Sequence, residues 1–575
     1  MATARKDLMQ RAVKPVSPQD EFVRFCMLSS VRGVPRILRS RSLCWQAVWL
    51  VSVFGFLGIS LLSITLLVNT YLSYQTVLEV TTRHYTQTVP FPSVTICNLQ
   101  PFSTDMVKRF IRNPNVNVTD MRFLNELKKM KNHPNYTSSF KALNEKSFLF
   151  QNWGIETVRK IGLTFHEFVL DGTCNFSFVQ AAKFQQRECN LRTDVLLIPN
   201  PQFFTCFMIS PTPDIANTTY SLEMDLYLDT EQLFDCQQTT ECHDALFDLD
   251  DSIGAHVLVH PAMTYPRISQ LGIHVLPGTK SVIEVVETRS LEKYEQSPKE
   301  TCTNKQLIDL FIGAKERTTA FPFAYESFTC RQLMVQEKIL SNCGCTDPDY
   351  PLTADMKDAP FCAELKKPGQ STDAFLKNYD CASRLELDPR NLIKENLNDQ
   401  CATPCQSISF KTTAYQSLWP PKTNELDFYR LRVQGKPLFG RKFDAYEQAE
   451  NFTRLGQHTE AARALKSPDA NAIRDNFLRL RVFRPDLSLT VTKEKLQITP
   501  ETLISQIGGS FSLWGGLTVI TTVELLEFVY YMAKRFVCSG YGGDSQSEQS
   551  GEAGEAGDVA MPLAVYASVR GPAAS

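Results

Sequence analysis

The sequence lacks a strong excess of charge of either sign, since 60 Lys and Arg residues stand against 62 Asp and Glu residues among 575 positions. A net charge of −2 excludes the basic character of a dedicated nucleic-acid-binding protein, so we expect no nucleic-acid partner. Long apolar runs are few, and the mean hydropathy of −0.19 excludes a transporter built from many membrane helices. Any membrane segments must be few.

Sequence motifs of common enzymes are also missing. There is no G-x-S-x-G, H-E-x-x-H, P-loop or G-x-G-x-x-G pattern, and only eight histidines occur in the chain. Cys343 and Cys345 could form a metal-binding pair, but disulfide bonds explain them better in a cysteine-rich extracellular region. We therefore predict a protein that is not an enzyme and that holds no cofactor and no metal.

One long apolar run lies near the N-terminus. No charged residue occurs between Arg41 and Glu79, and residues 45–68 are long enough to cross the hydrocarbon of a bilayer. A cleaved signal peptide is the alternative, but the run is too long, begins too late and has no small-residue cleavage site after it. Nine basic against three acidic residues in the first 42 positions predict a cytosolic segment 1–43 before a transmembrane helix at 44–70.

A second apolar run covers residues 503–532 and is followed by Lys534 and Arg535. On hydropathy alone it could be a buried core helix, because it contains four glycines and two glutamates. We predict a second transmembrane helix at 500–533 and a cytosolic tail at 534–575. The tail is rich in Gly, Ser and Glu, which favours disorder.

The cysteines decide between these alternatives. Fourteen of the seventeen lie between the two apolar runs, whereas Cys26, Cys44 and Cys538 lie outside. All five N-glycosylation sequons also lie between the runs. The cysteines are Cys97, Cys174, Cys189, Cys206, Cys236, Cys242, Cys302, Cys330, Cys343, Cys345, Cys362, Cys381, Cys401 and Cys405, and the sequon residues are Asn117, Asn135, Asn175, Asn217 and Asn451. We predict an extracellular region at 71–499 with up to seven disulfides, in a plasma-membrane protein whose two ends are cytosolic.

The extracellular region shows both helical and strand periodicity, which predicts an α+β membrane protein. Helical spacing occurs at residues 121–130, 304–314, 331–340 and 447–480, and strand-like alternation at 255–259, 281–286, 407–412 and 487–491. The last of these strands ends about ten residues before the second apolar run. A strand at this position could transmit force directly to the helix.

The second apolar run carries features of an ion path. Glu524 and Glu527 lie three residues apart and share a helix face. Acids within a membrane usually face a bundle interior or water and attract cations, although these two could also lie in solvent beyond the inner interface. The pairs Gly508-Gly509 and Gly515-Gly516 permit close helix contact or a helix break. Two spans cannot enclose a conduit, so a pore requires several copies of the chain.

Several motifs resemble one known family. Residues 91–98 (FPSVTICN), Gly272-x-x-Val275-x-Pro277-Gly278, the cysteines at 330–345 and 401–405, and residues 507–527 are similar to the epithelial sodium channel, degenerin and acid-sensing channel superfamily. The resemblance implies a homotrimer or heterotrimer in the lipid bilayer that conducts Na⁺ and is blocked by amiloride. It also implies an ectodomain of mixed α and β structure, shaped like a hand, with palm, β-ball, finger, thumb and knuckle.

The resemblance also implies roles for individual residues. The selectivity filter of the family falls on Gly516, Leu517 and Thr518, where Thr replaces the usual Ser, and the late acid of the pore falls on Glu524, followed by Glu527. Residues of the gate fall on Ser505, Gly508 and Gly509, where a bulky group at Ser505 would hold the channel open. The cytosolic His-Gly gating pair falls on Arg32 and Gly33, so only the glycine is kept.

Two features of acid-sensing channels are missing from the sequence, which argues against protons as the activating stimulus. Tyr74-Gln75 replaces the histidine pair of acid-sensing relatives, and residues 261–266 replace their acidic stretch. The chain as a whole most resembles the FMRFamide-gated sodium channels of invertebrates, which implies an extracellular neuropeptide as the ligand. A Phe-rich stretch at 165–207 is a candidate pocket wall, or else part of the core. Proton-gated, constitutive and mechanically gated sodium channels remain alternatives, as does a non-conducting cell-surface receptor.

Overall fold

The computed structural model describes residues 18–31, 33–84, 89–100, 145–230, 252–294, 302–313, 320–364, 372–387, 400–486 and 488–539. The chain divides into two compact units. The first contains Met1–Ser73 and Ile498–Ser575, and the second contains Tyr74–Gln497. The boundaries between the two units, at residues 73–74 and 497–498, lie close to the ends of the predicted extracellular region 71–499.

The first unit is helical. It contains α2 (Pro18–Leu28), α3 (Val34–Arg39), α4 (Leu43–Leu72), α19 (Pro500–Ser510), the π-helical turn η6 (Phe511–Gly515) and α20 (Val519–Ser539). Helix α4 is long and apolar enough to cross a membrane, and it covers the first predicted span. The second apolar run is bent by 76° between Pro500–Gly515 and Val519–Lys534, so it would count as a second span only if the bent pair forms one crossing.

The second unit is built on an eight-stranded sheet with strand order β1-β15-β10-β14-β7-β3-β4, in which β13 also pairs with β10. Its strands are β1 (Thr76–Arg83), β3 (Asn175–Gln180), β4 (Lys183–Glu188), β7 (Thr219–Tyr227), β10 (Thr279–Glu292), β13 (Gln406–Leu418), β14 (Phe477–Phe483) and β15 (Leu489–Leu496). All eight residues of β1 pair antiparallel with β15. The strands that follow α4 and precede α19 in the sequence are therefore neighbours in one sheet.

A five-stranded sheet packs against the first. Its order is β5-β6-β2-β8-β9, formed by β2 (Ser93–Asn98), β5 (Val195–Asn200), β6 (Phe204–Ile209), β8 (Ala255–His260) and β9 (Ile273–Val275). The main core joins Ile96 and Phe207 of this sheet to Phe176, Leu222 and Leu480 of the larger one. Each fully buried side chain of this size contributes about 1.5–3 kcal/mol, so this shared core holds the two sheets together.

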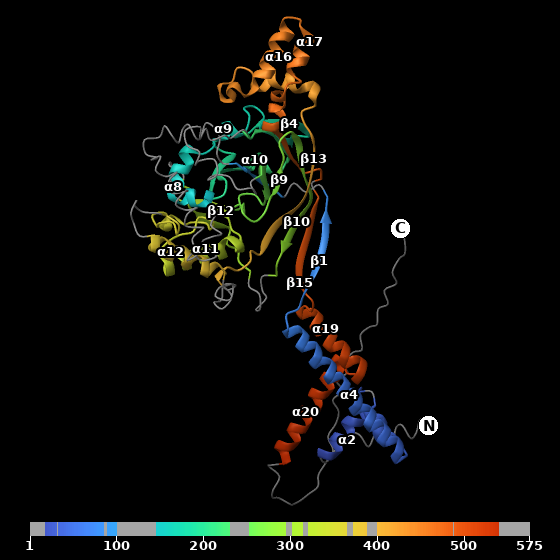
Figure 1. The fold of residues 1–575 in the computed structure, drawn as a ribbon. Helices are drawn as coiled ribbons and strands as arrows, with labels where there is room; N and C mark the ends of the chain where they lie inside the picture. The colour runs from blue at the N-terminus through green and yellow to red at the C-terminus, as the bar shows by residue number, and fades with distance from the viewer. Residues whose placement is uncertain are drawn as a thin grey trace, which may run out of the picture. The chain divides into compact units, whose positions relative to one another are not determined.

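Helices and short strands surround the sheets. They are α8 (Glu145–Ile161), α9 (Phe165–Phe168), α10 (Pro213–Ala216), β11 (Leu307–Leu310), β12 (Phe321–Ala324), α11 (Ser327–Cys343), η1 (Ala354–Met356), α12 (Thr372–Leu387), η2 (Lys422–Asn424), α15 (Glu425–Phe428), η3 (Tyr429–Val433), η4 (Pro437–Phe443), α16 (Asp444–Arg454), α17 (His458–Ala464), η5 (Pro468–Asn471) and α18 (Ala472–Asn476). Figure 1 shows α11 beside α12, and α16 beside α17 at one end of this unit.

Six disulfides link the described part of the second unit. They join Cys97–Cys206, Cys174–Cys189, Cys302–Cys405, Cys330–Cys401, Cys343–Cys381 and Cys345–Cys362. The expected disulfide-rich ectodomain is thus confirmed for twelve of the fourteen cysteines, while Cys236 and Cys242 lie outside the described residues. Cys343 and Cys345 bond to different partners and are not a metal pair. Cys26 and Cys44, which lie outside the predicted extracellular region, are free.

Two of the expected helices are wrong in part. At 304–314 the structure has the strand β11, whose residues alternate between exposed and buried while pairing with β12. At 447–480 the helix is broken into α16, α17 and α18 and ends before β14. In β14 the buried Leu478, Leu480 and Val482 alternate with Arg479 and Arg481, which is the period of a strand. The expected helix at 121–130 lies outside the described residues.

The other helix and strands expected in the extracellular region agree with the structure, the last strand only in part. Helix α11 contains the predicted helix at 331–340, and β8, β10 and β13 contain the strands predicted at 255–259, 281–286 and 407–412. The last predicted strand corresponds to β15, shifted toward the second apolar run, with residue 487 outside the described part.

Candidate functional site

The second apolar run is interrupted at Gly516. This residue has φ of 63° and follows η6 directly, in the left-handed region that other L-residues rarely adopt. The Leu517 amide donates to the Phe511 carbonyl oxygen at 3.1 Å, which closes the turn. The Thr521 amide donates to the Thr518 hydroxyl at 3.4 Å, where α20 begins. The three predicted filter residues therefore lie together at the helix break.

Glu524 is bound by a residue from the N-terminal segment. The Ser30 amide donates to Glu524 Oε2 at 2.9 Å, and the Ser30 hydroxyl donates to the same oxygen at 3.0 Å. The Ser30 hydroxyl also lies 2.8 Å from the Thr521 hydroxyl, and Thr521 is buried. Ser30 thus joins the predicted pore acid to the first turn of α20 across 494 positions of sequence, a contact that local sequence patterns could not predict.

Helix α2 packs on α20 next to this contact. Phe25 stacks on Phe528 with ring centroids 4.4 Å apart. A cavity of about 250 Å³ between these helices is lined by Glu21, Arg24, Glu524 and Glu527, among others. Glu527 therefore lies next to Glu524 as the sequence predicted, and the buried Glu21 adds a third carboxylate that the sequence analysis missed. Arg24 lies 3.6 Å from Glu21 and balances part of this charge.

Gly33 has a conformation and position that favour glycine. Its φ is 103°, and a Cβ atom at this residue would lie 2.7 Å from Cγ2 of Val53 in α4. Close by, the Arg36 guanidinium lies 5.8 Å from the ring centre of Trp49. Gly33 therefore permits the turn between α2 and α3 to approach α4. Arg32, its partner in the predicted gating pair, lies outside the described residues.

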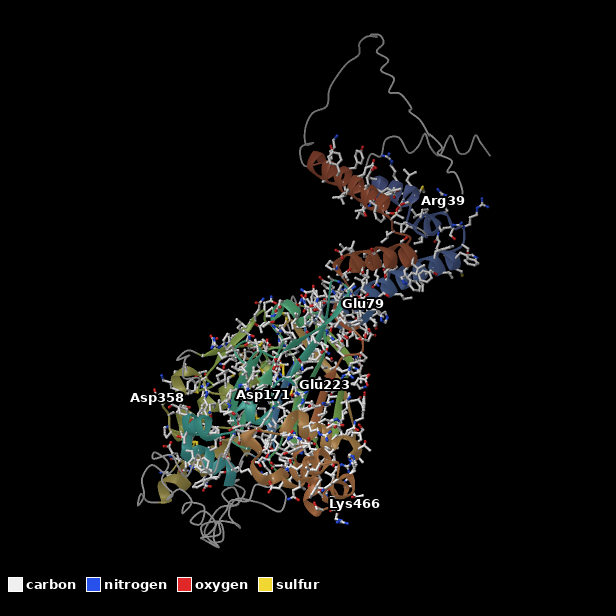
Figure 2. All side chains as sticks on the ribbon, turned by 90° about the horizontal axis from the view of Figure 1, so that it is seen from above. Arg39, Glu79, Asp171, Glu223, Asp358 and Lys466 are labelled. Carbon is white, nitrogen blue, oxygen red and sulfur yellow. A yellow bond between two sulfur atoms is a disulfide. The ribbon has the colours of Figure 1, made fainter. Side chains whose placement is uncertain are left out.

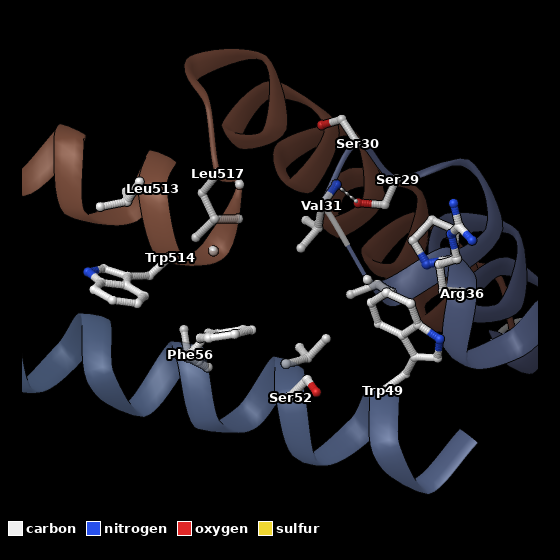
Figure 3. A pocket seen from close by; sticks show the side chains of 17 residues that line it. Ser29, Ser30, Val31, Arg36, Trp49, Ser52, Phe56, Leu513, Trp514 and Leu517 are labelled. Carbon is white, nitrogen blue, oxygen red and sulfur yellow. Dashed lines mark hydrogen bonds between the residues drawn. The ribbon is translucent and has the colours of Figure 1, made fainter. Parts of the chain in front are cut away.

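A larger cavity of about 740 Å³ lies between this turn, α4 and η6 (Figure 3). Phe56 and Trp514 stack with ring centroids 6.1 Å apart, and Leu517 lines the wall near them. On the opposite side, the Val31 amide donates to the Ser29 hydroxyl at 3.2 Å (Figure 3). The break at Gly516 thus faces an apolar chamber whose far wall is the N-terminal segment.

The predicted gate residues lie on α19, which continues unbroken through both glycines of the Gly508-Gly509 pair. Ser505, Gly508 and Gly509 are exposed, and a Cβ atom at either glycine would meet nothing within 4 Å. Of the two glycine pairs, only Gly515-Gly516 coincides with a helix break. No contact within the described part of this single chain requires glycine at 508 or 509.

In the second unit, the Phe-rich stretch 165–207 belongs mainly to the core. Phe168, Phe176, Phe178, Phe203 and Phe207 are all buried. Phe184 is the exception, with 79% of its surface exposed. The buried phenylalanines of this stretch thus belong to the core, which is the alternative that the sequence left open. Among the described residues, no cluster of three or more His, Cys, Asp or Glu side chains could hold a metal ion.

Two buried histidines have lowered pKa values. Burial lowers the pKa of His260 to about 3, and its ring nitrogens lie 2.9 Å from the hydroxyls of Thr95 and Thr264. Burial also lowers the pKa of His256, whose Nε2 lies 2.9 Å from the Leu271 carbonyl oxygen. Burial disfavours the charged form of both rings, and with a pKa of about 3 His260 does not gain a proton near neutral pH.

Comparison with known proteins agrees with this arrangement. A profile of the amiloride-sensitive sodium channel family matches residues 25–528, which include α4, both sheets, the break at Gly516 and Glu524. The chain belongs to this family. Members of the amiloride-sensitive sodium channel family are plasma-membrane ion channels and not enzymes.

Three relatives illustrate the range of the family. The FMRFamide-activated amiloride-sensitive sodium channel of Cornu aspersum is 23% identical, over 87% of this chain and 81% of its own length. The epithelial sodium channel subunit beta of Xenopus laevis is 20% identical, over 88% and 82%. Acid-sensing ion channel 2 of Homo sapiens is 22% identical, over 89% and 86%. The chain is thus similar to sodium channels and acid-sensing channels, two of which are named for different stimuli, a peptide and acid.

Proposed function

We propose that the chain is a subunit of a trimeric, amiloride-sensitive sodium channel that an extracellular neuropeptide of the FMRFamide type opens. The observation that carries the proposal is the break at Gly516 within an apolar segment, followed by Glu524 eight residues later. Irregular backbone at membrane depth is tolerated where it lines a water-filled cavity or is buried in protein. An acid on the same segment would attract cations to such a cavity.

The break suits a selectivity filter for a small cation. Leaving the helical conformation frees backbone carbonyl oxygens, and the Thr518 hydroxyl adds a further oxygen at the same level. Gly516, Leu517 and Thr518 would form the filter, with Glu524 and Glu527 below it. One chain supplies one such segment, so we propose that three identical or related subunits surround the Na⁺ path. The name of the Xenopus relative, a subunit, agrees with assembly from several chains.

The charge distribution supports two crossings with both ends in the cytosol. Basic residues precede α4, and Lys534 and Arg535 lie near the end of α20. Under this topology Ser30 and Gly33 would reach the inner end of the pore from the cytosol. Strand β15 ends at Leu496, only three residues before α19, and is paired along its length with β1. A ligand-induced movement of the sheet would therefore reach both membrane segments.

A peptide stimulus is favoured over protons for two reasons. The sequence has Tyr74-Gln75 where acid-sensing relatives have a histidine pair, and it resembles the FMRFamide-activated relative along most of both chains. His260, one of only eight histidines, is held neutral by burial near neutral pH, so it cannot serve as a sensor there. Ligand binding would act by favouring the open state of a closed-to-open equilibrium.

Voltage-clamp recording from cells that express only this chain tests the proposal. We expect an inward Na⁺ current when FMRFamide is applied, its block by amiloride, and no current when acid is applied alone. Glu524→Gln should change the conductance or the cation preference. Current with acid but not with peptide would contradict the proposed stimulus, and no current under any condition would favour a non-conducting receptor.

A further inference from the structure

A polar cavity in the second unit has no role in the ion path. Its volume is about 410 Å³, within the range of ligand sites. Four groups of residues line it, namely α8, the end of β5 with the β5–β6 turn, the segment that follows β8, and α11 with the segment after it. The residues are Ser147, Pro199, Asn200, Pro201, Gln202, Tyr265, Pro266, Arg267, Ile268, Ser269, Gln270, Gln332, Pro348, Asp349 and Tyr350.

The two charged residues among these lining residues are in different situations. The Arg267 guanidinium lies 4.5 Å from the ring centre of Phe328 and 3.9 Å from a carboxylate oxygen of Glu326, so its charge is balanced. Asp349 forms no ion pair with any residue that the structure describes, and only its amide is engaged, donating to Asp347 Oδ1 at 2.9 Å. Asp349 is therefore an acidic side chain on the cavity wall that no basic side chain among the described residues pairs with.

The carboxyl group of Asp349 and the phenol of Tyr265 both have shifted pKa values. Burial raises the pKa of the Asp349 carboxyl group above its ordinary value, although the side chain remains accessible from the cavity. Burial and the charge of Asp349 raise the pKa of Tyr265 to about 12, so that phenol stays neutral. The Asp349 side chain is exposed at the cavity wall and forms no ion pair with a described residue, so a cation that enters the cavity can pair with it.

The lining favours an organic cation over a metal ion. Calcium requires six to eight oxygen ligands, whereas a single carboxylate lines this cavity. The aromatic rings of Tyr265 and Tyr350 suit a guanidinium or ammonium group carried on an apolar stem. Tyr265 is held in place by an edge-on contact with Phe323, with ring centroids 5.4 Å apart.

We propose that this cavity receives a cationic group of the activating peptide, with the Asp349 carboxylate as its ionic partner and Tyr265 and Tyr350 along its stem. The inference rests on the proposed function and adds the binding subsite to it. An FMRFamide peptide carries two such groups, the arginine guanidinium and the N-terminal ammonium. Because Asp349 lies next to α11 and its disulfides, binding would alter the packing of this segment against the segment that follows β8.

The test pairs receptor variants with peptide variants in voltage-clamp recordings from the full chain. Asp349→Asn removes the charge and should raise the half-activating concentration of FMRFamide by about 10- to 100-fold, the usual worth of a charge-assisted hydrogen bond. A peptide with citrulline in place of arginine, or one with an acetylated N-terminus, removes one cation. The peptide that lacks the bound cation should be equally potent on the wild-type chain and on the variant.

Three further variants serve as controls for this test. Asp358→Asn removes an exposed carboxylate of the same segment outside the cavity (Figure 2) and should leave potency unchanged. Asp349→Ser provides a second neutral side chain in case Asp349→Asn fails to reach the surface, which surface biotinylation checks. Asp349→Glu keeps the charge and should retain the difference between the peptides.

The possible results distinguish a failure of the Asp349 subsite from a failure of the proposed peptide stimulus. If both modified peptides lose as much potency on the Asp349 variants as on the wild-type chain, Asp349 contacts neither cation and the inference is wrong. If the wild-type chain conducts an amiloride-sensitive Na⁺ current but does not respond to any peptide, the proposed stimulus is wrong and the subsite is overturned with it.

Discussion

At the scale of single residues, Ser30 changes the interpretation of Glu524. The sequence indicates an acid that faces the ion path, whereas the structure shows that acid accepting two hydrogen bonds from Ser30 of the N-terminal segment. A hydrogen bond to a charged group contributes about 1.5–3 kcal/mol, so Ser30 stabilises the docked position of this segment. Nearby Cys26 is buried and burial raises the pKa of its thiol, which makes it a reporter of docking.

We expect Ser30→Asp to release the N-terminal segment from α20, because it places a second negative charge against Glu524. The measurement is the rate at which a cytosolic thiol reagent modifies Cys26, in a background with Cys44 and Cys538 replaced by serine. The rate should rise about tenfold, which corresponds to roughly 1.4 kcal/mol. Ser30→Asn is the neutral control and should react slowly. Equal rates for both variants would show that the contact with Glu524 does not hold the segment.

His260 predicts a dependence of stability on pH. Its pKa falls from an ordinary 6.5 to about 3 on burial, so the unfolded chain binds a proton that the folded chain does not. The stability associated with the neutral His260 is fully present above pH 6.5. Below pH 6.5 the free energy of unfolding falls by about 1.4 kcal/mol per pH unit until the pKa of about 3 is reached. Thermal unfolding of the purified chain between pH 7.5 and pH 5 should show the loss. His260→Gln should make the unfolding temperature depend less on pH, whereas substitution of the exposed His458 should not. The same pH dependence in His260→Gln and in the wild-type chain would refute the lowered pKa of His260.

At the scale of elements, the break between α19 and α20 depends on one glycine. A left-handed conformation costs an ordinary L-residue about 1–2 kcal/mol, so Gly516→Ala should disturb the break. Gly516→Asn should be tolerated better, because asparagine adopts this conformation more readily. Reversal potentials in Na⁺ and K⁺ solutions should shift most for Gly516→Ala. Gly58→Ala in α4 is the matched control, because the residue has no left-handed φ and a Cβ atom there meets nothing within 4 Å. A larger shift for the control would contradict the role of Gly516.

At the scale of the whole molecule, the sequence predicted what depends on composition and period. The apolar run of α4, the even count of cysteines and the strands β8, β10 and β13 follow from patterns that a short window contains. Prediction from the sequence failed where contacts between residues far apart in the chain determine the structure. Leu480 was assigned to a helix because the alternation of β14 follows directly on helical residues, and β14 forms by pairing with β7 and β10. Ser30 and Asp349 carry no local signal, because their significance comes from segments that approach them only in the fold.

Glycosylation tests the proposed topology of the whole chain. Asn217 and Asn451 are exposed, whereas Asn175 is half-buried at the start of β3 and its amide lies 3.4 Å from the Gly172 carbonyl oxygen. We expect Asn217→Gln and Asn451→Gln each to remove one glycan, seen as a faster band in gel electrophoresis that glycosidase treatment of the wild-type chain also produces. Asn424→Gln, at an exposed asparagine without a sequon, is the control.

The cytosolic side is tested on the same cells with the free thiol of Cys44, which is exposed at the start of α4. A membrane-impermeant reagent should modify Cys44 only after the plasma membrane is opened. Glycans at residues 217 and 451 together with a protected Cys44 would require the chain to cross the bilayer between α3 and β1. If Cys44 reacts on intact cells, or if neither asparagine carries a glycan, α4 does not separate the two compartments in the proposed direction, and Ser30 could not approach Glu524 from the cytosol.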